Sequence, residues 1–125
     1  MNSTKTVLLA DDEVFMLRLL EATFRKGGYR VVQARTGKEA LGLATAERPD
    51  LIVMDVIMPD LDGLSALQQL RQAEATAGIP VIVLSSKGHA LTRMEAERAG
   101  ACLFLTKPFS PSQLLLEAKR ILGEG

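Results

Sequence analysis

Short apolar runs alternate with amphipathic segments along the 125-residue chain. The runs are rich in Val, Leu and Ile, and most of them do not alternate apolar with polar positions. Such a pattern is typical of strands that are covered on both faces, as in a parallel sheet. The pattern therefore predicts five strands, at Thr6–Ala10, Arg30–Ala34, Leu51–Met54, Val81–Leu84 and Cys102–Thr106.

The intervening segments indicate helices whose ends carry local signals. The first ends at the pair Gly27–Gly28, because glycine adopts the backbone angles that close a helix. Thr36 and Glu39 form a capping-box pattern before the second helix. The third follows Gly63 and finishes before Gly78. These signals predict one helix after each of the first three strands.

The last two helices differ in their signals. The fourth, roughly Gly88–Ala99, is the least apolar and ends at Gly100. The fifth has the clearest start, with Ser110 as N-cap, Pro111 at the first helical position and Gln113 closing the box. Five consecutive strand–helix units predict an α/β fold, a doubly wound sandwich with right-handed crossovers. The length suits a single domain over residues 1–125, with its core at about 6–122.

Polar side chains gather where the predicted strands end. Asp11, Asp12 and Glu13 follow the first strand, Asp55 the third, and a hydroxyl and a lysine the fourth and fifth. The carboxyl ends of parallel strands form the functional crevice of such sheets. Clustered carboxylates repel one another unless a cation intervenes, and an all-oxygen cluster suits Mg²⁺. Asp55 is then a candidate nucleophile for a phosphoryl group, which a lysine can help to neutralise.

Charge and cysteine content limit the partners. Fifteen basic and fifteen acidic residues cancel, so nothing supplies the basic field that nucleic acid or anionic lipid requires. The single cysteine, Cys102, fits a reducing cytosol, and we expect it to be a buried small hydrophobe that begins the fifth strand. No apolar run is long enough for a signal peptide or a membrane span. We therefore expect a cytoplasmic protein with no direct contact to nucleic acid or membrane.

From about Thr6 to Leu122 the sequence resembles a response-regulator receiver domain of two-component signalling. The acidic pair "DD" at Asp11–Asp12, "VMDVIMPDLDG" around Asp55, a hydroxyl at Ser85 and "FLTKPF" around Lys107 stand in the family's order. The resemblance implies a chemotaxis-regulator-like fold, with a five-stranded parallel sheet in the order 2-1-3-4-5 and helices on both faces. It also implies a phosphoacceptor signalling domain, which assists its own phosphorylation and dephosphorylation, rather than an enzyme.

The resemblance further assigns roles to single positions. Asp55 would accept the phosphoryl group from a phosphohistidine of a sensor histidine kinase or phosphotransfer protein. The expected ligands of Mg²⁺, with Mn²⁺ as an alternative, are Asp11, Asp12, Asp55 and the backbone carbonyl of Ile57. Lys107 would pair with the phosphoryl group, and the Lys107–Pro108 peptide bond would be cis. Ser85 would move to bond the phosphoryl group, and the ring of Phe104 would turn inward behind it.

The resemblance also implies an output. Helix 4, strand 5 and helix 5 would change their affinity for a downstream output protein or a covalently linked output domain, with homodimer formation on activation left open. Two other classes compete with this interpretation. A haloacid-dehalogenase-type phosphatase requires a second acid at the place of Ile57, and a flavodoxin-like FMN binder requires a phosphate loop where Asp11 and Asp12 would repel phosphate.

Some polar residues have simpler interpretations. Asp60 and Asp62 are expected to shape the loop after Asp55, and Asp12 could also cap the first helix. His89 is expected to lie in solvent at the start of the fourth helix. Ile57, two residues after Asp55, is bulky and apolar, and Lys87 is basic two residues after Ser85. We expect Ile57 to hinder an attacking water and so to prolong the life of the phosphoryl group.

Overall fold

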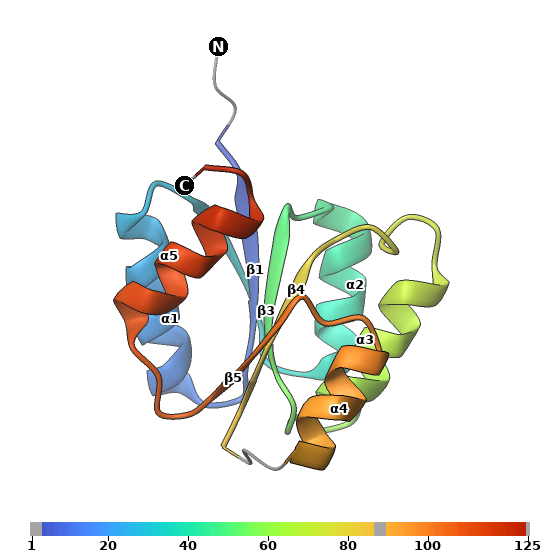
Figure 1. Cartoon of the computed structure of the whole chain (residues 1–125). Coiled ribbons are helices and arrows are strands. Elements are labelled where there is room, and N and C mark those ends of the chain that lie inside the picture. The colour runs from blue at the N-terminus through green and yellow to red at the C-terminus, as the bar shows by residue number, and fades with distance from the viewer. Residues whose placement is uncertain (1–3, 87–89, 125) are drawn as a thin grey trace.

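A computed structural model of the chain describes residues 4–86 and 90–124. Five strands form one parallel sheet in the order β2-β1-β3-β4-β5, which confirms the predicted fold class and strand order. The strands are β1 (Thr6–Ala10), β2 (Arg30–Ala34), β3 (Leu51–Asp55), β4 (Val81–Ser85) and β5 (Leu103–Thr106). They run in one direction, so all their carboxyl ends lie at the lower edge of the sheet in Figure 1.

Helices cover both faces of this sheet (Figure 1). They are α1 (Val14–Lys26), α2 (Gly37–Glu47), α3 (Gly63–Gln72), α4 (Ala90–Arg98) and α5 (Pro111–Ile121). The apolar faces of α1 and α5 pack on one side, and those of α2, α3 and α4 pack on the other. Among the helices of the described residues, none has the length and apolar character needed to cross a membrane.

The burial of the strands depends on their place in the sheet. Every residue of β1, β3 and β4 is buried, because each of these strands has a neighbour on both sides and helices above and below. The outer strands β2 and β5 are only partly buried. A continuous apolar run in the sequence therefore predicted the three inner strands better than the two outer ones. These three inner strands form a rigid base for the residues at their carboxyl ends.

Local capping signals were accurate at two helix starts. The Thr36 side chain accepts a hydrogen bond from the Glu39 N–H, and the Ser110 side chain accepts one from the Gln113 N–H. Asp62 caps α3 in the same way by accepting from the Ser65 N–H. The expectation that Asp12 could cap α1 is wrong. Glu13 occupies the N-cap position, and among the described residues its side chain makes no cap hydrogen bond.

Both expectations for Cys102 are also wrong. Cys102 is exposed and precedes β5, because the chain leaves the end of α4 through Gly100, whose φ is 101°, and joins the sheet only at Leu103. The third helix ends at Gln72, which agrees with the expectation that it finishes before Gly78. Lys87 and His89 lie outside the described residues, and α4 is described from Ala90.

Candidate functional site

The sheet register brings three charged side chains to one edge. Asp11 follows the last residue of β1, Asp55 is the last residue of β3, and Lys107 follows the last residue of β5. Ala10 pairs with Met54, Asp55 with Leu84, and Ser85 with Thr106. Residues up to 96 positions apart in the sequence therefore lie within hydrogen-bonding distance. This is the convergence that the sequence predicted for the strand ends.

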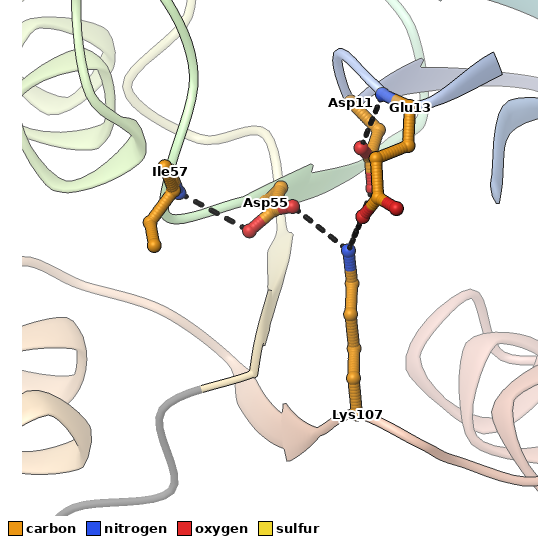
Figure 2. A network of polar contacts seen from close by, with 5 residues as sticks. All are labelled: Asp11, Glu13, Asp55, Ile57 and Lys107. Atoms are coloured by element: carbon orange, nitrogen blue, oxygen red, sulfur yellow. Dashed lines mark hydrogen bonds and ion pairs between the residues drawn. The ribbon is translucent and has the colours of Figure 1, made fainter.

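Lys107 links the carboxylates of this edge (Figure 2). Its Nζ lies 2.8 Å from Asp55 Oδ2, 2.9 Å from Asp11 Oδ2 and 3.5 Å from Glu13 Oε1. The Lys107 side chain is 10% exposed, and those of Asp11 and Asp55 are 0% and 8% exposed. The two short contacts are thus shielded from water, where an ion pair is stronger than at the surface.

Burial and pairing shift two pKa values in this group. Burial by itself lowers the pKa of Lys107, but the hydrogen bonds and negative charges of Asp55 and Asp11 outweigh it and raise the pKa above its ordinary value. Burial raises the pKa of Asp11, against the opposing effects of the Glu13 N–H and Lys107. Lys107 therefore stays positively charged, and burial destabilises the negative charge of Asp11.

The carboxylates fit a divalent metal ion. One oxygen from each of Asp11, Asp12 and Asp55 can be chosen so that all lie within 4.8 Å of one another. A single lysine leaves these charges undercompensated, and oxygen ligands are those that Mg²⁺ or Mn²⁺ prefers. Asp12 is exposed while the other two are buried, so the cluster is open to solvent on one side. The donor set thus suits a hard ion that retains some of its water.

The loop after β3 fixes the second oxygen of Asp55. The Ile57 N–H donates to Asp55 Oδ1 at 3.1 Å, while Oδ2 faces Lys107 (Figure 2). The Ile57 side chain is 49% exposed beside the carboxylate. Each carboxylate oxygen has its own donor, which holds the group in one orientation. The role of the Ile57 carbonyl as a metal ligand stays a prediction.

Glycine is required where this loop turns back into α3. A Cβ on Gly63 would lie 2.2 Å from the Asp55 carbonyl oxygen, and the Gly63 N–H donates to Val56 O at 2.7 Å. Asp60 has a φ of 67° and accepts a hydrogen bond from the Gly37 N–H at 3.0 Å. Asp60 and Asp62 therefore shape the loop, as the sequence suggested. Of the three acids in this segment, Asp55 is the one that contacts Lys107.

The remaining predicted residues surround this group. Ser85 is buried at the end of β4, and its carbonyl accepts a hydrogen bond from the Lys107 N–H at 2.7 Å. The Lys107–Pro108 peptide bond is cis, as predicted. Phe104 is 3% exposed, so its ring lies inside the core, and the Arg93 guanidinium sits 4.9 Å from the ring centroid.

Two contacts at the site were not predicted from the sequence. Glu13 stands in the acidic run after β1, but nothing local indicated that its side chain would reach Lys107. Arg93 lies in the polar helix α4, where an arginine is ordinarily assigned to solvent. Both contacts join residues from different elements, so their signal appears only in the folded chain.

Similarity to known proteins identifies the family of this chain. The sequence pattern of the response regulator receiver domain matches residues 7–119. The chain belongs to this family. The receiver domain of the sensor histidine kinase PA1611 from Pseudomonas aeruginosa, solved with magnesium in its active-site cleft, is 32% identical, with a TM-score of 0.89 over 97% of this chain and 99% of that one. A response regulator structure from Chloroflexus aurantiacus is 33% identical with a TM-score of 0.92, over 97% and 99% of the two chains.

Curated relatives of this receiver domain fall into two length classes. The alkaline phosphatase synthesis transcriptional regulatory protein PhoP of Bacillus subtilis is 39% identical over 94% of this chain and 48% of that protein. Protein PilH of Pseudomonas aeruginosa is 34% identical over 94% of this chain and 97% of that protein. This receiver domain thus spans about half the length of PhoP and nearly all of PilH. Family membership favours the receiver interpretation over the phosphatase and FMN-binding alternatives.

Proposed function

We propose that this receiver domain is a phosphorylation-controlled switch whose phosphoacceptor is Asp55. The observation that carries the proposal is the position of the Asp55 carboxylate, which ends an inner strand between Lys107 and the Ile57 N–H. Asp11 and Asp12 stand beside it as the other acids of the cluster. The donor is a phosphohistidine of a sensor histidine kinase or of a phosphotransfer protein. We also propose that residues 1–125 form a single receiver domain.

The transfer is a displacement at phosphorus. An Asp55 carboxylate oxygen forms a bond to phosphorus while the bond from phosphorus to the histidine nitrogen breaks, and that nitrogen keeps the electron pair. Lys107 neutralises part of the charge on the transferred group, and the Ile57 N–H keeps the carboxylate aimed. Mg²⁺ held by Asp11, Asp12, Asp55 and the Ile57 carbonyl would offset the repulsion between the carboxylates and the phosphoryl oxygens.

We propose that the signal leaves through β4, β5 and α4. Ser85 pairs in register with Thr106, and Val83 with Phe104, so a shift of Ser85 toward a phosphoryl group acts directly on β5. Arg93 of α4 contacts the Phe104 ring, which couples that helix to the same strand. The α4-β5-α5 face would then change its affinity for a partner, to the extent that phosphorylation favours one of its two arrangements.

We propose the partners only as classes of protein. Phe15 is 83% exposed at the start of α1, and the half-exposed Ile57 lies beside Asp55, so apolar side chains flank the site where a protein donor would approach. Because the relatives include both longer proteins and one of similar length, the output partner is either a linked domain or a separate protein. We propose a cytoplasmic location because the donor kinase and the reduced Cys102 both belong there.

Intact-mass measurement after incubation with Mg²⁺ and acetyl phosphate tests this function. We expect one phosphoryl adduct on the wild type and none on Asp55→Asn, because an amide cannot serve as the acceptor. Asp62→Asn, which changes an exposed acid of the same loop, is the matched control and should still be labelled. Absence of an adduct on the wild type, while another receiver domain is labelled in parallel, would contradict the proposal.

A further inference from the structure

Glu13 is the most exposed of the acids that contact Lys107. Its side chain is 65% exposed, compared with 0% for Asp11 and 8% for Asp55, and its Oε1 lies 3.5 Å from Lys107 Nζ (Figure 2). Glu13 occupies the N-cap position of α1, directly after Asp12. Its carboxylate therefore stands at the solvent side of the site, where a donor must enter.

Lys107 does not depend on this third acid. Its contacts with Asp55 and Asp11, at 2.8 and 2.9 Å, are shorter and buried, and these two residues account for the raised pKa of the lysine. A 3.5 Å contact to an exposed carboxylate contributes far less, because water screens it. Removal of the Glu13 charge should leave Lys107 in place.

The structural contacts of Glu13 come from its backbone. Its N–H donates to Asp11 Oδ1 at 2.9 Å, and its carbonyl accepts the first helical hydrogen bond from Leu17 at 3.0 Å. Within the described part of the chain, the Glu13 side chain does not cap this helix start. A substitution of the side chain therefore changes the charge at the entrance and leaves the positions of Asp11 and α1 as they are.

The Glu13 charge is also poorly compensated. Within residues 4–86 and 90–124, its recorded ion pair is with Lys107, whose single charge is already shared by two closer carboxylates. An incoming phosphoryl group carries a charge of about −1.5 to −2 near pH 7. A fixed negative charge at the entrance lowers the local concentration of such a donor, and salt weakens the effect.

We infer that Glu13 is a specificity-determining residue that disfavours small anionic phosphodonors. The inference rests on the proposed function, because it concerns access to Asp55. A phosphohistidine presented by a protein can bring compensating positive charge with it, whereas a free acyl phosphate cannot. Glu13 thereby reduces labelling by free metabolites relative to labelling by a protein donor.

The chemical step is the same for wild type and variants. With acetyl phosphate, an Asp55 oxygen bonds to phosphorus as the bond between phosphorus and the acetate oxygen breaks, and acetate leaves with the electron pair. Glu13 takes no part in these bonds. Its effect must therefore appear in the approach of the donor and must depend on donor charge and on ionic strength.

The test compares labelling rates of wild type, Glu13→Gln and Glu13→Lys with acetyl phosphate at saturating Mg²⁺. At low ionic strength we expect Glu13→Gln to be faster by about threefold to tenfold and Glu13→Lys to be faster still, with the differences nearly lost at about 1 M salt. Phosphoramidate, a less negatively charged donor, should show a smaller gain. Glu47→Gln, at the far end of α2 where Glu47 pairs with Arg30, is the matched control and should behave as wild type.

The outcomes separate this inference from the proposed function. Equal or lower rates for Glu13→Gln at low salt would overturn the inference, and so would a gain that persists at high salt, since that would indicate a role in positioning Lys107. Failure of the wild type to be labelled at all would overturn the proposed function, and the inference with it.

Discussion

Ile57 lies two residues beyond Asp55 and presents its side chain, 49% exposed, beside the carboxylate that its own N–H holds. We expect a bulky apolar group at this place to exclude water from the line of attack on a phosphoryl group. We predict that Ile57→Asn shortens the lifetime of the phosphorylated state several-fold, because a smaller polar side chain admits and orients water. A dephosphorylation time course measures this, with Ile57→Leu as the control of similar bulk. An unchanged rate in Ile57→Asn would contradict it.

Tyr29 lies at the opposite end of the sheet. It is the single tyrosine of a chain without tryptophan, so tyrosine absorbance probes that end alone. Burial together with the hydrogen bond and the negative charge of Glu124 raises the pKa of Tyr29 above its ordinary value. Because the folded-state pKa is the higher one, the stabilisation is complete below about pH 10 and is lost as pH rises further.

We predict that tyrosinate absorbance of the folded protein develops well above pH 10, and that Glu124→Gln moves it down by removing the negative charge. The free energy of unfolding should fall as pH rises above about 10, less steeply in the variant. An alkaline spectrophotometric titration and urea unfolding measure the two effects. Identical titrations of wild type and Glu124→Gln would contradict the assignment.

At the scale of elements, the turn from β3 into α3 holds the least tolerant position. A Cβ at Gly63 would lie 2.2 Å from the Asp55 carbonyl oxygen, so the backbone of Gly63 or of Asp55 would have to shift. We predict that Gly63→Ala costs about 2–4 kcal/mol of unfolding free energy and slows labelling of Asp55.

Gly42 provides the matched control for that substitution. It lies within α2 with nothing within 4 Å of an added Cβ. Gly42→Ala should therefore stabilise the protein by about 0.5–1 kcal/mol, because alanine favours the helix. Urea unfolding of both variants measures the contrast, and similar effects of the two substitutions would contradict the proposed close contact.

Element boundaries were predictable where a local interaction sets them. Thr36 and Ser110 bond N–H groups three residues away, so the sequence contains the whole signal. Cys102 and Asp12 were misplaced because their surroundings are set by distant segments. The Cys102 N–H donates to Val81 O on β4. Glu13 is the N-cap of α1, and the neighbouring acid Asp11 bonds to Lys107 from the end of β5.

For the whole molecule, parallel topology explains why the site could be anticipated. Once five strands run in one direction, Asp11, Asp55 and Lys107 must share an edge. The topology does not decide which acid approaches the lysine most closely, or that Arg93 stacks on Phe104. Those details depend on side-chain packing between elements, which no short stretch of sequence encodes.

The acidic cluster also predicts how stability responds to metal and pH. Mg²⁺ should raise the melting temperature, because the folded cluster fits a metal ion and the unfolded chain lacks such a site. Burial raises the pKa of Asp11, so protons compete with the metal at a higher pH than for an ordinary aspartate. The gain from Mg²⁺ should therefore shrink as pH falls. Thermal unfolding with and without Mg²⁺ across acidic pH measures this, and a gain that is constant down to about pH 4 would contradict it.

The central claim is that Asp55 carries an acyl phosphate. Its most direct test is to label the protein with acetyl phosphate and Mg²⁺, reduce it with borohydride, and locate the reduced residue by peptide mass spectrometry. Borohydride converts an aspartyl phosphate to homoserine and leaves a free carboxylate unchanged. We predict homoserine at position 55, with Asp11, Asp12 and Asp62 unaltered. Homoserine at another aspartate, or none in protein that carries the phosphoryl mass, would contradict it.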